Sequence, residues 1–352
     1  MSETASDQNQ SVRYGAGIRF SLESELSALG CSRALVLSTP QQSDVALNIA
    51  GSLGDKAAGV CSRAKMHTPV EVTEDVMAHA KAAQTDCYVA VGGGSTIGLG
   101  KALALRSGLP QIVIPTTYAG SEATPILGQT EDGIKTTLSD ARVLPRVILY
   151  DPELVVSLPR DLTVTSGLNA MAHAIEALYA RDRTDESTKM ALTGLACFVT
   201  ALPNVIRDPS DLAAREHTLV GAWNCGAVLG RVGMALHHKL CHTLGGSFNL
   251  PHAQTHAIVL PHATGYNEAA VPNLLAPVAD MLQGTSAGTA LWDFAKSLDA
   301  PTALKDFGLT ENDLDRAADL ATQNPYWNPR EIARPDLRQL LQNAWAGHAP
   351  GT

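Results

Sequence analysis

The chain has 352 residues, is rich in aliphatic side chains and contains only 5% aromatic residues. This length predicts two domains with a large buried core, and the composition favours an α/β or α-rich enzyme over a β-sandwich. The net charge of −9, with no basic block, argues against nucleic acid and anionic membrane surfaces as partners.

The chain begins with the polar segment MSETASDQNQ. This composition predicts a disordered lead over residues 1–12 rather than a signal peptide. No apolar run reaches the roughly 18 residues that a membrane span needs. The six cysteines include no CxxC pair, so we expect reduced thiols in a cytoplasmic protein, with Cys241 as the one candidate for reactivity.

The first half of the chain alternates short apolar runs with helical segments. Strands are predicted at 33–38, 87–91, 111–114, 135–138 and 147–149, and helices at 76–83 and from the glycine run after 91 to residue 105. Buried strands that alternate with helices predict an open parallel sheet with right-handed crossovers. We therefore expect an α/β dinucleotide-binding domain over residues 13–159.

A glycine-rich segment separates the strand at 87–91 from the following helix. Glycines let the backbone approach a pyrophosphate, and a helix N-terminus offers free N–H groups and a positive dipole end. A tight turn without a ligand is the alternative, but the position after a buried strand favours nucleotide binding. The candidate cofactor contacts are Gly93, Gly94 and Ser95, with Thr116 and Thr117 at the end of the next strand.

The end of the strand at 33–38 bears on the choice of cofactor. In dinucleotide-binding folds this position often carries a carboxylate that holds the ribose and repels a 2′-phosphate. In this chain Ser38 and Thr39 occupy the strand end, in place of a carboxylate. Both are assigned to cofactor binding, and we expect the protein to accept NADH and NADPH.

After residue 159 only helices are predicted, which defines a helical substrate and catalytic domain over residues 160–352. The predicted helices span 164–180, 187–206, 210–230, 232–244, 252–260, 272–284, 286–298, 310–321 and 335–346.

Residues 234–262 hold more than half of the eleven histidines. His238 and His242 stand four residues apart and share one helical face, and Gly245-Gly246 is expected to end that helix. His252 opens a second helical run that is expected to close at Pro261. Satisfied core histidines are the alternative, but imidazoles clustered in this way usually indicate a metal site or proton chemistry.

Several segments together resemble the iron-containing alcohol dehydrogenase superfamily. They are the GGGS run after a strand, Pro115-Thr116-Thr117 on the next strand, GLNAMAHAIEA with Asn169 and His173 four apart, and HHKLCHTLGG followed by LPH. The resemblance covers about residues 13–346. It implies a dehydroquinate synthase-like fold with an α/β N-terminal domain and an all-α C-terminal domain, and commonly a homodimer.

A more specific set of motifs looks like the maleylacetate reductases within this superfamily. They are TYAGSEATP at 117–125, KTT at 135–137, VTSGLN at 164–169 and NPYWNPR at 324–330. The resemblance implies NAD(P)H-dependent reduction of the carbon–carbon double bond of maleylacetate, a dicarboxylate, to 3-oxoadipate in the degradation of aromatic compounds.

The chain departs from the superfamily at the metal ligands. Metal-dependent members hold their ion with one Asp and three His, which the motifs place at Asn169, His173, His238 and His252. An amide oxygen is neutral and binds a metal more weakly than a carboxylate does. We therefore expect a metal-independent enzyme with no bound metal. Gly98 also replaces an Asp of the superfamily, and the loop after Thr117 is one residue shorter.

Without a metal, the imidazoles would have to stabilise or protonate the enolate that forms on hydride transfer. The resemblance places His242 beside the nicotinamide, which makes it the leading proton donor, and assigns polarisation of the substrate and carboxylate binding to His173, His238 and His252. The other predicted contacts are Asn169, Tyr118 and Tyr326 for the substrate and Lys135 for the cofactor. By helical spacing Lys239 falls off the shared face, and it is not assigned to the site.

Two other functions remain open at this level. One is a metal-dependent alcohol or polyol dehydrogenase with the same fold, and the other is a protein that senses NADH without turnover. A measurement of NADH oxidation separates the second from both enzymes.

Overall fold

The computed structural model describes residues 5–7 and 10–351. The chain divides into two compact units, Met1–Leu158 with Pro209–Leu219, and Pro159–Asp208 with Val220–Thr352. The predicted domain boundary after residue 159 stays a prediction. The helix that begins there, α5 (Arg160–Tyr179), has Pro159 as its N-cap in an extended conformation.

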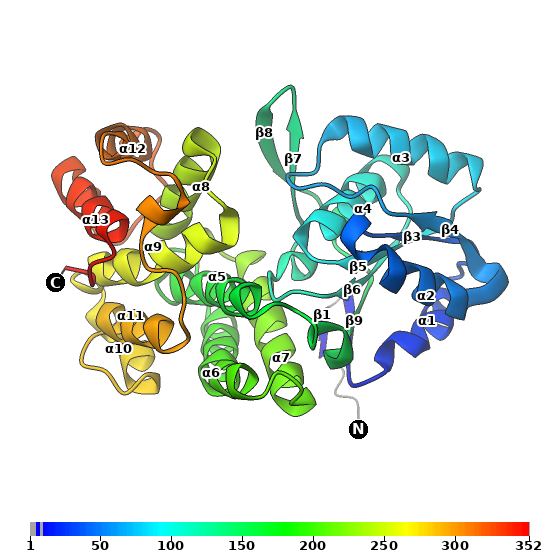
Figure 1. Ribbon diagram of the computed structural model, residues 1–352, viewed down its shortest axis with the longest axis horizontal. Coiled ribbons are helices and arrows are strands. Elements are labelled where there is room, and N and C mark those ends of the chain that lie inside the picture. The colour runs from blue at the N-terminus through cyan, green and yellow to red at the C-terminus, as the bar shows by residue number, and fades with distance from the viewer. Residues whose placement is uncertain (1–4, 8–9, 352) are drawn as a thin grey trace. The chain divides into compact units, whose positions relative to one another are not determined.

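The strands of the first unit are β1 (Ala5–Asp7), β2 (Gln10–Tyr14), β3 (Ala34–Leu37), β4 (Ala57–Cys61), β5 (Cys87–Gly92), β6 (Gln111–Pro115), β7 (Ile126–Glu131), β8 (Ile134–Ser139) and β9 (Val147–Tyr150). Within the described residues, a seven-stranded sheet has the order β1-β2-β9-β6-β5-β3-β4 (Figure 1). Every neighbouring pair is parallel except β1 and β2. The predicted α/β class with an open parallel sheet is confirmed.

Helices cover both faces of this sheet because its strands are apolar on both sides. The helices are α1 (Leu22–Ala28), α2 (Ser43–Leu53), α3 (Val70–Ala82) and α4 (Gly94–Ser107). On β3, Val36 packs in a cluster with residues of α1 and α2, whereas Leu35 and Leu37 pack with residues of α3 and α4. The carboxyl ends of the strands, where nucleotides bind in such sheets, carry the glycine-rich turn.

The first unit differs from the prediction in several places, and α1, α2 and β7 were not predicted. Lys135 lies on β8, which pairs with β7 in a separate antiparallel hairpin rather than in the main sheet. The Asp132-Gly133 turn, with both residues at positive φ, is a strong hairpin signal that the periodicity analysis overlooked. Strand β4 was not predicted because its sequence, AAGVC, is short and weakly apolar.

Part of the expected disordered lead is strand. β2 pairs in parallel with β9, and its Val12 is fully buried, because the alternating apolar residues of this strand supply one edge of the core. Residues 1–4 and 8–9 of the expected lead lie outside the described residues.

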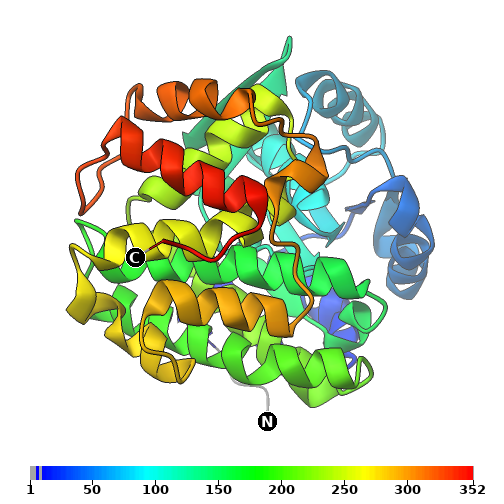
Figure 2. The same ribbon diagram turned by 60° about the vertical axis from the view of Figure 1, so that its left-hand side comes forward.

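The second unit is helical, as predicted. Besides α5, its helices are α6 (Asp185–Arg207), α8 (Leu236–Phe248), α9 (His252–Glu268), α10 (Pro272–Met281), α11 (Ala287–Ser297), α12 (Asp313–Thr322) and α13 (Arg334–Ala346), and α7 (Leu212–Leu229) contributes its residues from 220 onward. Figure 2 shows α13 (red) lying beside α12 and α9. Apolar residues of α8, α9, α12 and α13 form a shared core cluster.

Two helices run past their predicted ends. Helix α8 continues through Gly245-Gly246 and ends at Phe248, and its C-cap Asn249 adopts the left-handed conformation. Leu244 and Leu250 are buried in the shared core cluster, and this packing offsets the low helix propensity of the two glycines. Helix α9 continues through Pro261, because it crosses α11 closely: a Cβ on Gly288 would lie 2.6 Å from the Cα of Gly265.

Helix α6 is the one described helix that is long and apolar enough to cross a membrane by length and composition alone. Its apolar residues pack inside the protein. A Cβ on Gly167 of α5 would lie 3.0 Å from Leu202 and 3.4 Å from Phe198 of α6, so these two helices are in close contact. We therefore assign α6 to the core of the second unit.

Candidate functional site

Helix α5 supplies three polar side chains on one face of its apolar stretch, residues 167–178. Asn169, His173 and Glu176 are spaced at i, i+4 and i+7, and each is at least 96% buried. Asn169 Oδ1 and His173 Nδ1 have no hydrogen-bond partner in the part of the chain that the structure describes. Buried polar atoms without partners are rare in folded proteins, and atoms of this kind can bind a ligand, an ion or a water molecule.

Glu176 connects α5 to the start of α8. Its carboxylate accepts hydrogen bonds from the backbone N–H groups of Ala235 at 2.9 Å and His237 at 2.7 Å, and so caps the N-terminus of α8. It also accepts a hydrogen bond from His238 Nδ1 at 2.7 Å. Three N–H groups converging on the two oxygens fit the ionised carboxylate. The proton on Nδ1 leaves His238 Nε2 as a lone-pair donor, and this buried atom has no partner among the described residues.

Helix α9 brings further imidazoles to the same place. The ring of His238 lies 5.2 Å from that of His173 and 5.2 Å from that of His256. The ring of His252 lies 4.2 Å from that of His256, one turn later on α9. His173, His238 and His252, which the resemblance aligns with metal ligands of the superfamily, therefore belong to one connected cluster of imidazoles. Asn169, the fourth aligned residue, lies one turn before His173 on α5.

Burial controls the protonation of this cluster. It holds the pKa of His173 well below its ordinary value, and the neighbouring His238 lowers it further. Burial and then the nearby His242 hold the pKa of His238 well below its ordinary value. The pKa of His237 is lowered to about 4, again mainly by burial. These imidazoles are neutral near pH 7, which is the form that binds a metal.

His242 lies at the exposed side of the cluster, and its ring is 6.1 Å from that of His238. Its Nδ1 shares a hydrogen bond of 2.9 Å with the hydroxyl of Tyr326. Tyr326 belongs to the segment between α12 and α13, which Asn328 fastens to Asn267 of α9 through two amide hydrogen bonds of 2.9 and 2.7 Å. The structure thus brings two of the predicted site residues, His242 and Tyr326, into direct contact.

The glycine-rich turn of the first unit has the shape of a phosphate site. Gly93 is the N-cap of α4, and no side chain of the described chain caps this helix, so its first N–H groups remain available to an anion. A Cβ on Gly93 would lie 2.8 Å from the side chain of Thr117, whereas one on Gly94 would meet open space. Thr116 Oγ1 accepts a hydrogen bond of 2.6 Å from Gln42.

The other predicted contacts of the first unit have different surroundings. Ser38 is fully buried and donates a hydrogen bond of 2.8 Å to the hydroxyl of Ser62, while Thr39 is half-buried at the end of β3. Tyr118 is fully buried, and its hydroxyl accepts a hydrogen bond of 3.0 Å from Arg215. Lys135 is exposed on the β7–β8 hairpin.

Three buried residues of the second unit were missed by the sequence analysis: Glu176, His237 and His256. Glu176 had a readable signal, since it follows His173 by three residues on the same apolar helix. His237 and His256 are fully buried, and the backbone carbonyl of His256 accepts a hydrogen bond from His237 Nε2 at 3.0 Å. Cys241 is buried beside them, and burial raises the pKa of its thiol well above its ordinary value, so it is not a reactive thiolate.

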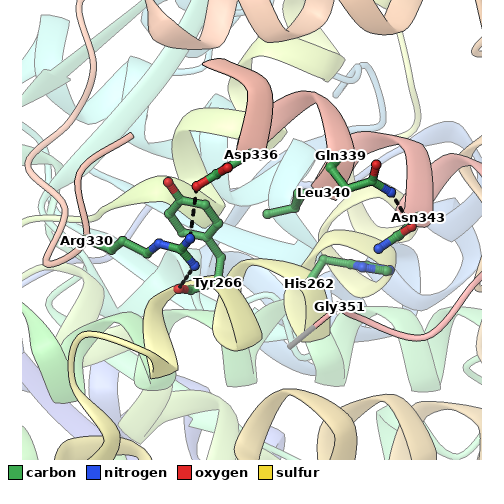
Figure 3. A pocket seen from close by; sticks show the side chains of 8 residues that line it. All are labelled: His262, Tyr266, Arg330, Asp336, Gln339, Leu340, Asn343 and Gly351. Carbon is green, nitrogen blue, oxygen red and sulfur yellow. Dashed lines mark hydrogen bonds and ion pairs between the residues drawn. The ribbon is translucent and has the colours of Figure 1, made fainter. Parts of the chain in front are cut away.

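A cavity of about 160 Å³ lies between α9 and α13 and is lined by His262, Tyr266, Arg330, Asp336, Gln339, Leu340, Asn343 and Gly351 (Figure 3). Arg330 is engaged there in structural contacts. It pairs with Asp336 at 2.9 Å, donates to the carbonyl of Tyr266 at 3.1 Å and lies 4.0 Å over the ring of Tyr266. We therefore do not assign Arg330 to substrate binding.

Comparison with known proteins places the chain among iron-containing alcohol dehydrogenases. Residues 9–152 match the family model described as iron-containing alcohol dehydrogenase, and residues 163–345 match the C-terminal model of the Fe-containing alcohol dehydrogenase family. A maleylacetate reductase from Rhizobium sp. (strain MTP-10005) is 57% identical over 96% of both chains. A crystal structure of maleylacetate reductase from Agrobacterium tumefaciens is 55% identical, with a TM-score of 0.95 and 99% of both chains covered.

The chain is also similar to a protein described as an alcohol dehydrogenase. An iron-containing alcohol dehydrogenase from Corynebacterium glutamicum is 37% identical, with a TM-score of 0.93, over 99% of this chain and 98% of that one.

The expectation of a metal-independent protein with no bound metal is contradicted by these matches, because the family is iron-containing. The residues also fit a divalent cation. Three buried atoms that can offer a lone pair to a metal have no hydrogen-bond partner among the described residues: Asn169 Oδ1, His173 Nδ1 and His238 Nε2. The expectation considered only the neutral amide of Asn169. The buried carboxylate of Glu176, which is bonded to Nδ1 of His238, adds negative charge next to the proposed ligands. Ligand atoms of Glu176, His237 and His238 lie within 4.8 Å of one another.

Proposed function

The chain belongs to the iron-containing alcohol dehydrogenase family, and from this premise we propose that it reduces the carbon–carbon double bond of maleylacetate with NAD(P)H to give 3-oxoadipate. The observation that carries the proposal is the similarity to maleylacetate reductases over nearly the whole chain. The cluster of buried imidazoles around Glu176 supplies the chemistry that such a reduction requires.

The reaction adds one hydride and one proton across the double bond and breaks no carbon–carbon bond. Addition of hydride to the alkene carbon β to the ketone moves negative charge onto the ketone oxygen, and a proton must reach the α carbon. When bound, NAD(P)H supplies the hydride, and an iron ion supplies Lewis-acid stabilisation of that oxygen. The side chains that would hold the ion are Asn169, His173, His238 and His252.

The protein's own part in the reaction begins with Glu176. Its hydrogen bond to His238 Nδ1 keeps the proton on that nitrogen, so Nε2 presents a lone pair in a fixed orientation. The two backbone hydrogen bonds to Ala235 and His237 hold the carboxylate itself in place. Glu176 is therefore a positioning residue, and it does not need to touch the substrate.

We assign the proton transfer to His242. Its exposure allows exchange with solvent, and its hydrogen bond to Tyr326 orients the ring. In this assignment His242 gives a proton to the α carbon of the enolate and regains one from water, and Tyr326 holds the imidazole in position. The assignment rests on the resemblance of this position to the one beside the nicotinamide.

Cofactor choice follows from the end of β3. The hydroxyl of Ser38 donates a hydrogen bond to Ser62, and Thr39 is the other hydroxyl side chain at the end of this strand. Because neither carries a negative charge that would repel a 2′-phosphate, we propose that NADH and NADPH are both accepted. A homodimer and a cytoplasmic location remain predictions, and light scattering of the purified protein tests the first.

The function is tested by following NADH oxidation at 340 nm with maleylacetate and with a panel of simple aldehydes and ketones. We expect rapid oxidation with maleylacetate only, and NMR of the product should show 3-oxoadipate. Faster turnover of the simple carbonyl compounds would overturn the proposal in favour of an alcohol or polyol dehydrogenase.

The metal requirement is tested separately. We expect dialysis against a chelator to remove activity and added Fe²⁺ to restore it, with elemental analysis following the metal content. Full activity in protein shown to be free of metal would contradict the metal site.

A further inference from the structure

Lys239 occupies the rim of the imidazole cluster, directly after His238 on α8. Its ammonium lies 5.8 Å from the centroid of the Tyr326 ring, whose hydroxyl is bonded to His242. Within residues 5–7 and 10–351, no carboxylate pairs with this ammonium and no hydrogen bond from it is found. A half-buried lysine without an acidic partner, beside a candidate proton donor, is a cation available to a ligand.

The position of Tyr326 next to Lys239 is fixed by the fold. Asn328, two residues after Tyr326, exchanges two hydrogen bonds with Asn267 of α9, and its side-chain oxygen also accepts from the backbone N–H of Leu236 at 3.3 Å. Because Leu236 is the first residue of α8, the segment that carries Tyr326 and the helix that carries Lys239 are joined at this point. The three groups, Lys239, Tyr326 and His242, therefore form one edge of the site.

The charge of the substrate favours a further cation at this edge of the site. Maleylacetate carries two carboxylates, whereas the chain has a net charge of −9 and the cluster itself contains the buried carboxylate of Glu176. An uncompensated carboxylate brought next to this cluster would be repelled.

We propose that the ammonium of Lys239 binds a carboxylate of the dicarboxylate substrate and thereby selects acids over simple aldehydes and alcohols. This inference deepens the proposed function and rests on it. Lys239 acts on binding, because its charge contacts the substrate in the ground state and the transition state alike.

The test compares Lys239→Gln and Lys239→Arg with a matched control, Lys296→Gln, which removes the same charge from an exposed position on α11. We expect Lys239→Gln to raise the KM for maleylacetate about 10- to 100-fold, as for loss of a charge-assisted hydrogen bond, with kcat changed less than about threefold. Lys239→Arg should recover most of the loss. The control should match the wild type, and the salt dependence of kcat/KM should weaken only in Lys239→Gln.

Calorimetric binding of 3-oxoadipate separates failure of this inference from failure of the proposed function. Wild-type turnover with an unchanged KM in Lys239→Gln would overturn the role of Lys239 and leave the function standing. Binding of 3-oxoadipate that depends on Lys239, in a protein that does not reduce maleylacetate, would support the carboxylate site and overturn the function. If the wild type neither reduces maleylacetate nor binds 3-oxoadipate, both proposals fail.

Discussion

Replacement of Glu176 by glutamine tests the link between the fold and the metal site. The carboxylate is 1% exposed and accepts three hydrogen bonds. One oxygen receives the N–H of Ala235 and Nδ1 of His238, and the other receives the N–H of His237. A glutamine has the same shape, but one of its two acceptors becomes an NH₂ donor.

The arrangement of the donors sets the size of the effect. Whichever oxygen is replaced, the NH₂ group faces at least one backbone N–H, and a buried donor is left without a partner. That loss costs about 1–3 kcal/mol of unfolding free energy. If the NH₂ group faces His238, the ring can accept through Nδ1 only by moving its proton to Nε2, which removes the lone pair from the metal. We expect metal affinity to fall about 10- to 100-fold, as for other partners of metal-bound histidines.

The assay is competition for Zn²⁺ or Fe²⁺ against a chromophoric chelator, together with urea unfolding of the metal-free protein. Glu268→Gln is the matched control. The carboxylate of Glu268 also accepts two backbone N–H bonds at a helix start, from Ala287 at 2.7 Å and Gly288 at 3.2 Å, and no histidine bond to it is found within the described chain. The control should lose stability and keep its metal affinity.

Two outcomes would refute the reasoning. Metal affinity within about threefold of wild type in Glu176→Gln would show that the carboxylate does not orient His238. An equal fall in metal affinity for Glu176→Gln and Glu268→Gln would show a general loss of structure instead of a specific effect on the site.

Three further predictions concern other residues. Lys101→Met should lower the unfolding free energy in urea by about 3 kcal/mol, because its buried ammonium bonds three carbonyls of residues 121–126 at 2.6 to 2.8 Å; unchanged stability would contradict this. His242→Ala should lower kcat about 10²- to 10⁴-fold with little change in NADH affinity by fluorescence, and a kcat within a few-fold of wild type would remove His242 from the proton transfer. Thr39→Asp should raise the KM for NADPH about tenfold or more relative to the KM for NADH in steady-state kinetics. An equal rise in KM for both cofactors would refute the assignment of the end of β3 to the cofactor's ribose.

Local sequence was sufficient to predict the elements whose residue pattern does not depend on contacts with distant parts of the chain. The apolar runs that became β3, β5, β6 and β9 are buried on both faces, so their composition alone predicts parallel strands. The i, i+4 spacings of Asn169 with His173 and of His238 with His242 likewise fixed which side chains share a helical face. The glycine-rich turn was predicted from its position between a buried strand and a helix, and Gly93 has no room for a side chain beside Thr117.

Tertiary structure decided the rest. Helix α8 continues through Gly245-Gly246 and α9 continues through Pro261 because packing against other helices outweighs local helix propensity. The residues adjacent in the sequence carry no information about that packing. The metal prediction was wrong for the same kind of reason: it weighed Asn169 by itself, while Glu176 acts on a histidine 62 positions away in the sequence. Lys239 was set aside by helical spacing, yet a segment 87 residues later places the ring of Tyr326 beside it. Charge and hydrogen bonding act through space, so the roles of these residues depend on which helices meet.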